Sequence, residues 1–219
     1  MRVGRAPLLA RWCLPAVLSL IAACSRGNTP APGSLPPPVP EVAPAGTRLA
    51  PTPAHAGPLD PAVTTDDLDA LWARQLMVPV EGITRAVLKD NFTAGRGNSR
   101  LHAALDILAP KSTPVLAADD HVIGRLTEGP VGGIVIYASD LDARFVYYYA
   151  HLQRYRRGLS VGDRVAKGSV IGYVGTTGNA PPNTPHLHFQ VMKRGRGRAW
   201  WDGPPINVFS FFALDGLRP

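Results

Sequence analysis

The chain has 219 residues and a formal net charge of +7, from 23 basic and 16 acidic residues. Three of the basic residues, Arg2, Arg5 and Arg11, lie in an N-terminal segment that we expect to be removed, which leaves 20 basic residues and a net charge of +4. This bias is compatible with an anionic polymer or a membrane surface, but it is too weak and too scattered to indicate a nucleic-acid-binding protein.

The N-terminal segment has the pattern of an export signal. Its arginines precede an apolar run, Leu14 to Ala23, that contains a proline and is too short to span a membrane. The end of this run, Ile21-Ala22-Ala23-Cys24, resembles a bacterial lipobox, which predicts a signal peptide at residues 1–23 and lipidation of the Cys24 thiol. An ordinary signal with an incidental cysteine is the alternative. Because Cys13 lies in the removed segment, we expect no disulfide in the mature chain.

Residues 24–61 indicate a tether that follows the lipid anchor. They are dominated by Pro, Ala, Gly, Ser and Thr, a composition that cannot bury a core. A short helix is predicted next, at residues 62–77, with Thr64 or Thr65 as its N-cap. Its apolar residues recur at helical spacing: Leu68, Leu71, Trp72 and Leu76. We expect this helix to pack on the domain that follows.

From Val78 onward the sequence consists of short strand-like runs separated by Gly, Pro and Asp. This pattern predicts one compact, mostly β domain at residues 78–219, with no internal helix and no internal repeat. The candidate strands are residues 115–117, 121–126, 134–138, 144–150, 164–165, 170–174 and 186–192.

Two loops of this domain have compositions that could carry a function. Arg194, Arg196 and Arg198 alternate with glycines before Trp200-Trp201, which indicates a solvated loop. The alternative is a basic rim with stacking aromatic rings that contacts a polymer. The glycines between residues 172 and 178 lack the pattern of a phosphate-binding loop, so we interpret them as turns.

The residues that carry chemistry centre on His186 and His188. Residues i and i+2 of a strand project from the same face, so both imidazoles would point into one site. His102, Asp106 and one histidine of this pair supply the three nitrogen and oxygen ligands that a catalytic zinc requires. His151 and the other histidine of the pair would then be unligated bases or hydrogen-bond donors. A surface strand with two polar residues is the simpler alternative for the pair alone.

Several segments resemble the lysostaphin/LytM-type zinc metallopeptidases, peptidase family M23, in the order in which that family has them. The resemblance covers roughly residues 80 to 210. Its segments are His102-Ala-Ala-Leu-Asp106-Ile-Leu-Ala-Pro, Thr113-Pro-Val-Leu-Ala-Ala, Tyr149-Ala-His151-Leu, Val161-Gly-Asp-Arg-Val-Ala-Lys-Gly-Ser-Val-Ile-Gly-Tyr-Val-Gly-Thr-Thr-Gly178 and Pro185-His186-Leu-His188-Phe.

The resemblance implies an antiparallel β-sheet domain that binds one Zn²⁺ through His102, Asp106 and His188. It implies that His151 and His186 are the unligated catalytic histidines. The sequence departs from the family at two positions: Ala104 stands where glycine is usual, and Gln190 stands where glutamate is common.

His121 matches no ligand position of the family. It follows Asp119-Asp120 at what resembles a turn into a strand, so we expect it to face solvent.

The family implies a zinc endopeptidase that hydrolyses peptide cross-links of bacterial peptidoglycan. Two alternatives stay open, a non-catalytic wall-binding activator of cell-wall amidases and a zinc peptidase acting on other proteins. A cell-wall amidase or the division machinery is a possible partner class. Acyl chains on Cys24 would hold the protein to a membrane. Ser25 stands where aspartate would favour the inner membrane, which indicates an outer membrane and its periplasmic face.

Overall fold

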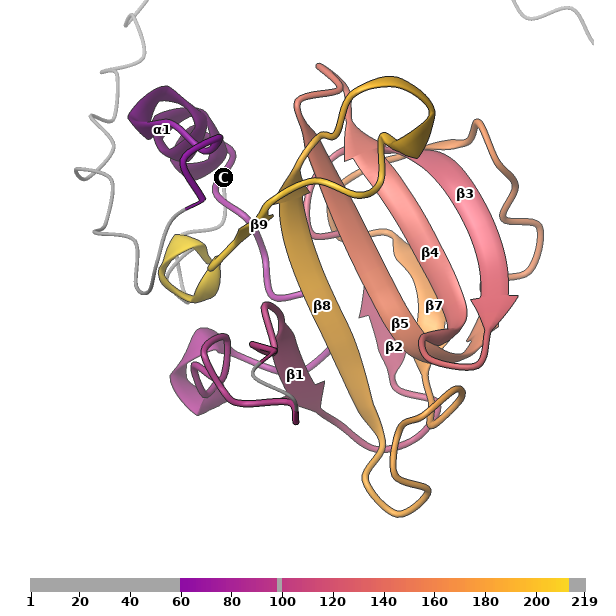
Figure 1. Cartoon of the computed structure of the whole chain (residues 1–219). Coiled ribbons are helices and arrows are strands. Elements are labelled where there is room, and N and C mark those ends of the chain that lie inside the picture. The colour runs from indigo at the N-terminus through magenta and orange to yellow at the C-terminus, as the bar shows by residue number, and fades with distance from the viewer. Residues whose placement is uncertain (1–59, 98–99, 213–219) are drawn as a thin grey trace, which may run out of the picture. The chain divides into compact units, whose positions relative to one another are not determined.

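The computed structural model describes residues 60–97 and 100–212 (Figure 1). All of them belong to the unit Arg48–Pro219. The predicted signal peptide, Cys24 and nearly all of the tether lie outside the described residues. No helix in the described part of the chain is long and apolar enough to cross a membrane.

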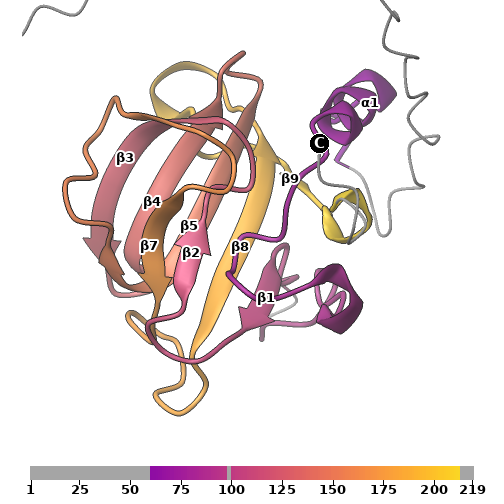
Figure 2. The same cartoon turned by 180° about the vertical axis from the view of Figure 1, so that it is seen from behind.

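Nine strands in the described residues form one antiparallel sheet. The main order is β1-β8-β5-β4-β3-β6, while β7 pairs with β5 and β2, and β9 pairs with β8. Figure 2 shows the far side, where β2 lies beside β7. The strands are β1 (Leu105–Leu108), β2 (Pro114–Leu116), β3 (His121–Gly129), β4 (Gly133–Asp140), β5 (Phe145–Tyr155), β6 (Arg164–Val165), β7 (Val170–Val174), β8 (His186–Lys193) and β9 (Pro205–Ile206).

The prediction of a mostly β chain with an antiparallel sheet is confirmed. The bounds of β6 and β7 agree with the sequence pattern, and β3, β4 and β5 extend further than predicted. The sequence pattern missed β1 and β9, which are short and pair only with β8.

β5 lies at the centre of the fold because it pairs with β4, β7 and β8. Side chains alternate between the two faces of a strand. Phe145, Tyr147 and Tyr149 are fully buried on one face, whereas Tyr148 is half-buried on the other. The first face forms the hydrophobic core, and the second face carries the candidate site.

The helix α1 (Thr65–Ala73) is shorter than the helix predicted at residues 62–77, and its buried leucines join the hydrophobic core of the domain, as expected. Thr64 is its N-cap and forms a capping box with Asp67, because each side chain bonds the other residue's backbone N–H. The helix ends before Gln75, whose φ of +48° is left-handed. Its apolar face is buried, and the Trp72 ring contacts the Phe211 ring edge-on with 6.1 Å between centroids.

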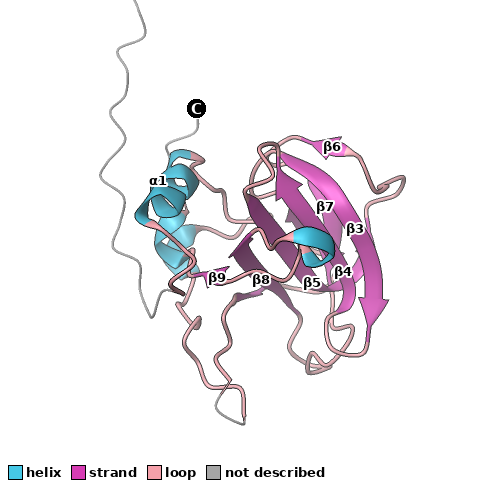
Figure 3. Ribbon diagram, turned by 45° about the horizontal axis from the view of Figure 1, so that its top comes forward, coloured by secondary structure: helices cyan, strands magenta, loops and turns pink. Residues whose placement is uncertain are grey.

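Three short 3₁₀ turns complete the described structure: η1 (Arg85–Val87), η2 (Gly197–Ala199) and η3 (Phe209–Phe211). Figure 3 shows α1 apart from the strands, while one helical turn lies in front of β4 and β5. This turn is η2, in the loop of residues 194–204 between β8 and β9. The loop therefore covers part of the sheet face that carries Tyr148.

Candidate metal centre and active site

The side chains predicted to bind zinc lie together. Asp106 on β1 is the register partner of His188 on β8, and His102 comes just before β1. The His102 Nε2 atom lies 2.9 Å from Asp106 Oδ1 and 3.0 Å from His188 Nδ1. The His188 Nδ1 atom lies 2.9 Å from Asp106 Oδ1. Among the described residues, these three (the metal cluster) form the one group of His, Cys, Asp or Glu side chains suited to a shared metal ion.

The metal cluster fits a zinc ion in geometry and in chemistry. Zinc binds imidazole nitrogen and carboxylate oxygen at about 2.0–2.1 Å, so two ligands of a tetrahedral ion lie about 3.3 Å apart. The separations of 2.9–3.0 Å in the metal cluster are close to that value. Three protein ligands also leave a fourth position for water or substrate, as a catalytic zinc site requires.

Asn91 orients two members of the metal cluster. The Nδ1–H of His102 donates to the Asn91 carbonyl over 3.0 Å, which leaves His102 Nε2 free to act as a ligand. The backbone N–H of Asp106 donates to Asn91 Oδ1 over 3.2 Å. Sequence reasoning missed Asn91, since it lies in a loop and no motif surrounds it.

The charges in the metal cluster suit a cation. Burial opposes ionisation of Asp106, but the close contacts with the His102 and His188 rings hold its pKa well below the usual range. Burial lowers the pKa of His188 against the attraction of Asp106, so its ring is neutral at neutral pH. The second carboxylate oxygen, Oδ2, contacts the Arg96 guanidinium. Metal binding needs an ionised carboxylate and a neutral imidazole, and both are present.

His151 reaches the metal cluster from β5 through a bulge. The pairing of β4 with β5 shifts register at this point. His151 has a φ of +59°, a left-handed conformation that is uncommon for residues other than glycine. A bulge redirects a side chain, and here it brings the His151 ring centroid to 5.6 Å from that of His188. Backbone strain of this kind concentrates at functional sites.

The His151 ring is held in one tautomer. Its Nδ1–H donates to the Thr177 carbonyl over 2.9 Å, so Nε2 carries a lone pair. Burial lowers the pKa of His151 to about 4, although the bond to Thr177 opposes this effect. The ring is therefore a neutral proton acceptor at neutral pH.

His186 is held in the same way. Its Nδ1–H donates to the Thr184 carbonyl over 2.7 Å, and its Nε2 atom lies 3.8 Å from Asp106 Oδ1. The ring centroids of His186 and His151 are 5.0 Å apart. As the i, i+2 spacing predicts, His186 and His188 face the same site. The carbonyls of Thr177 and Thr184 could not be identified from sequence, because backbone partners leave no residue-type signal.

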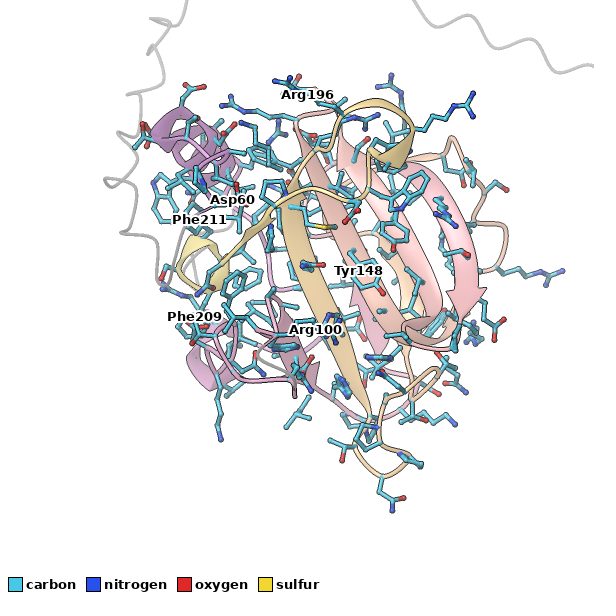
Figure 4. All side chains as sticks on the ribbon, viewed as in Figure 1. Asp60, Arg100, Tyr148, Arg196, Phe209 and Phe211 are labelled. Atoms are coloured by element: carbon cyan, nitrogen blue, oxygen red, sulfur yellow. The ribbon has the colours of Figure 1, made fainter. Side chains whose placement is uncertain are left out.

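Four of the five site residues, His102, His151, His186 and His188, line a cavity of about 600 Å³. Figure 4 shows Arg100 and Tyr148 on the same side of the sheet, in front of β8 and β5. The cavity is lined by side chains from five parts of the chain, among them Arg96, Arg100, His102, Tyr137, Tyr148, His151, His186, His188, Gln190 and Trp201.

The two departures from the family pattern fit the local structure. The Gln190 amide N–H donates to the Ala103 carbonyl over 2.9 Å, a bond that an ionised glutamate could not donate. Ala103 has a φ of +58°, so this bond fixes a strained residue between His102 and β1. Ala104 is buried and does not need the positive φ that favours glycine.

The prediction that His121 faces solvent is wrong. The residue begins β3 and is fully buried, with its Nε2 atom 2.6 Å from the Tyr149 hydroxyl. Its ring centroid lies 4.3 Å from that of Tyr147. The preceding Asp119-Asp120 suggested an exposed turn, but Asp119 is itself buried, and Arg74 pairs with it over 3.1 Å.

Comparisons with known proteins agree with the geometry of the site. The sequence model of peptidase family M23 matches residues 100–200. The chain is 34% identical over 116 residues to the L-Ala–D-Glu endopeptidase of Bacillus subtilis, covering 51% of this chain and 35% of that protein. It is 33% identical over 99 residues to the peptidoglycan DD-endopeptidase ShyC of Vibrio cholerae, covering 45% of this chain and 22% of that protein. The chain thus matches only about a third or less of these relatives' length.

The chain is also similar to a solved structure, the catalytic domain of the antimicrobial peptidase lysostaphin from Staphylococcus simulans. It is 26% identical with a TM-score of 0.46, and the match covers 65% of this chain and 95% of that one.

Proposed function

We propose that the protein is a zinc-dependent endopeptidase that hydrolyses peptide cross-links of bacterial peptidoglycan, since residues 100–200 match the sequence model of peptidase family M23. One observation carries the proposal. Three ligand atoms lie within 3.0 Å of one another, and two further imidazoles, each bonded to a backbone carbonyl through Nδ1, line the adjoining cavity. The names of the two relatives, an L-Ala–D-Glu endopeptidase and a peptidoglycan DD-endopeptidase, support the substrate class.

In this proposal, His102, Asp106 and His188 would hold one Zn²⁺. A bound zinc ion supplies Lewis acidity, which acidifies water and polarises a peptide carbonyl. The Arg96 guanidinium contacts the second oxygen of Asp106, Oδ2, and leaves Oδ1 facing the two histidines.

His151 and His186 move the protons. Each donates its Nδ1–H to a backbone carbonyl, so each has an Nε2 lone pair that can accept a proton from the attacking water. Once protonated, the same Nε2–H becomes a donor that can stabilise the oxyanion of the cleaved peptide bond or protonate the leaving amine. The two rings are equivalent in this respect, so they share the base and oxyanion roles.

The experiment that tests the proposal is digestion of purified sacculi by the purified protein. We expect soluble peptide products by mass spectrometry, loss of activity with a zinc chelator and recovery on adding zinc. Binding to sacculi and stimulation of a cell-wall amidase that both survive chelation, without cleavage, would establish the non-catalytic alternative. Digestion of a panel of other proteins but not of sacculi would establish a peptidase for a different substrate.

We also propose that the protein is exported and anchored by lipid on Cys24, at the periplasmic face of an outer membrane. The support is the lipobox-like segment that ends at Cys24 and the serine that follows it. Cys24→Ala should abolish labelling with a fatty-acid analogue and release the protein from the membrane fraction. Labelling that persists in this variant would contradict the anchor.

A further inference from the structure

A row of half-buried side chains leads away from the metal cluster, and the first three of its four members line the cavity. The row crosses four neighbouring strands, and its members are register partners that project from one face: Gln190, Tyr148, Tyr137 and Arg125. The ring centroids of His188 and Tyr148 are 5.9 Å apart, and those of Tyr148 and Tyr137 are 4.8 Å apart. The Trp201 ring follows at 6.4 Å from Tyr137. An aromatic wall therefore starts at the metal cluster and leads away from it.

Trp201 is held in place by a loop that is closed by backbone hydrogen bonds. The loop of residues 194–204 is closed by bonds from Lys193 N to Pro204 O over 2.9 Å and from Gly195 N to Trp200 O over 3.0 Å. The Trp200 ring lies against Gly124, where an added Cβ would come within 2.3 Å of the ring. Gly124 thus leaves room on β3 for the indole, which fixes the position of its neighbour Trp201.

Polar groups flank the aromatic wall. The Arg125 guanidinium lies 4.5 Å from the Trp201 ring centroid and 5.9 Å from that of Tyr137. Asp202 and Gln190 line the same cavity. Flat apolar faces edged by planar polar side chains match a sugar ring, whose C–H groups pack on the ring faces and whose hydroxyls take the hydrogen bonds.

We propose that Tyr148, Tyr137 and Trp201 form a subsite for a saccharide unit attached to the peptide being cleaved. This inference rests on the proposed function, since peptidoglycan carries its peptides on glycan strands. The three successive distances between ring centroids, from His188 through Tyr148 and Tyr137 to Trp201, set an upper limit of about 17 Å on the distance from the His188 ring to the Trp201 ring. An extended peptide of about five residues, at 3.3–3.6 Å per residue, spans this distance. A sugar joined to a short peptide can therefore occupy the wall while the peptide crosses the metal cluster.

The charges in the cavity favour a neutral saccharide over an ammonium group. Aromatic rings beside a carboxylate can also hold a cation. Here Arg125 already covers the Trp201 ring, and Arg96 and Arg100 line the cavity against the single carboxylate of Asp202 at this wall. A second cation would be repelled, whereas a neutral sugar would not.

The test compares two forms of one substrate, cross-linked muropeptides with their disaccharides and the same peptides after an amidase has removed the glycan. We expect Trp201→Ala to raise KM roughly tenfold for the glycan-bearing form, the loss of about one stacking contact, and to change the glycan-free form less than about twofold. Zinc content should stay unchanged, and Trp201→Phe should keep most of the glycan preference.

The matched control is Tyr173→Ala. Tyr173 also lies under an arginine, with the Arg154 guanidinium 3.6 Å from its ring centroid, but it is outside the cavity lining. Tyr173→Ala should have the wild-type KM for both the glycan-bearing and the glycan-free substrate. An equal loss on both substrates in Trp201→Ala, or no loss on either, would overturn the saccharide subsite and leave the peptidase intact.

A binding measurement separates this inference from the proposed function. The Trp201 indole N–H resonance, assigned by its absence in Trp201→Phe, should shift on titration with a disaccharide-tetrapeptide and not with the free tetrapeptide. If the wild type cleaved neither substrate, the peptidase proposal would fail, and this shift would still decide the subsite. No shift with the disaccharide-tetrapeptide would contradict it.

Discussion

Two clusters of histidine and carboxylate lie on opposite faces of the same sheet, and they contain similar residues in different surroundings. The metal cluster lies where a cavity opens, and its ligand atoms face one another. The buried cluster is formed by Asp119, His121, Tyr147 and Tyr149, and all four side chains are buried in the protein interior. Strand β5 separates the two clusters, because its Tyr147 and Tyr149 side chains belong to the buried cluster whereas its Tyr148 side chain lines the cavity on the other face.

The comparison shows that a displaced pKa does not by itself mark a catalytic histidine. Burial lowers the pKa of both His151 and His121 to about 4. His151 keeps its Nε2 free at the cavity, whereas the His121 Nε2 is bound to the Tyr149 hydroxyl at 2.6 Å. His151 therefore differs from His121 in having an Nε2 atom that faces the cavity, where a substrate can reach it.

The largest effect is expected in the metal cluster. His188→Ala should lose its zinc and lower the rate of muropeptide cleavage by more than about a thousandfold, because a three-ligand site has no replacement ligand. Metal analysis and initial rates measure both effects. His186→Ala, two residues away on the same face, is the matched control and should keep its zinc. Full zinc occupancy in His188→Ala, with loss in His186→Ala, would show that the two roles are reversed.

A smaller loss is expected when the proton-transferring rings are removed. His151→Ala and His186→Ala should each lower the rate roughly a hundred- to a thousandfold while zinc content and unfolding free energy change little. Neither ring belongs to the metal cluster, and each bonds a backbone carbonyl, that of Thr177 or Thr184. Variants that cleave at the wild-type rate would leave these histidines with no catalytic part.

The buried cluster should respond in stability rather than in chemistry. His121→Ala should lower the free energy of unfolding by about 3 kcal/mol, because it leaves a cavity and an unsatisfied Tyr149 hydroxyl. Its rate per folded molecule should stay within about twofold of the wild type. Chemical denaturation and activity at low temperature test this, with Tyr149→Phe as a milder variant. A hundredfold loss of rate at full folding would place His121 among the functional residues.

The pH dependence of stability should show a smaller difference. His121 binds a proton below about 4 when folded and below 6.5 when unfolded, so the unfolded state binds more protons between these values. Stability is complete above pH 6.5 and falls as pH decreases, by about 1.4 kcal/mol per pH unit. Between pH 7 and pH 5, His121→Leu should therefore lose about 2 kcal/mol less than the wild type. Parallel stability curves would contradict this assignment.

The sequence predicts features that depend on neighbours in the chain. A strand-like run between turn residues indicated β7, a cap at Thr64 or Thr65 indicated the start of α1, and the i, i+2 spacing placed His186 and His188 on one face. The choice of His188 as the ligand came from the family resemblance, since spacing treats the two alike.

Features that depend on distant contacts could not be read from the sequence. Asn91 contacts the metal cluster from a loop, and the bulge at His151 arises from the register of β5 against β4. The burial of His121 depends on Tyr147 and Tyr149, which lie 26 and 28 residues further along the chain. The polar residues around Asp119 therefore led to the wrong prediction that His121 faces solvent.

The most direct test of the account is the zinc content of two matched substitutions, Asp106→Asn and Asp119→Asn. Each replaces one carboxylate by an amide of the same shape, one in the metal cluster and one in the buried cluster. We predict one zinc per chain in the wild type and in Asp119→Asn, and little or none in Asp106→Asn. One zinc per chain in Asp106→Asn, or zinc lost only in Asp119→Asn, would contradict the account.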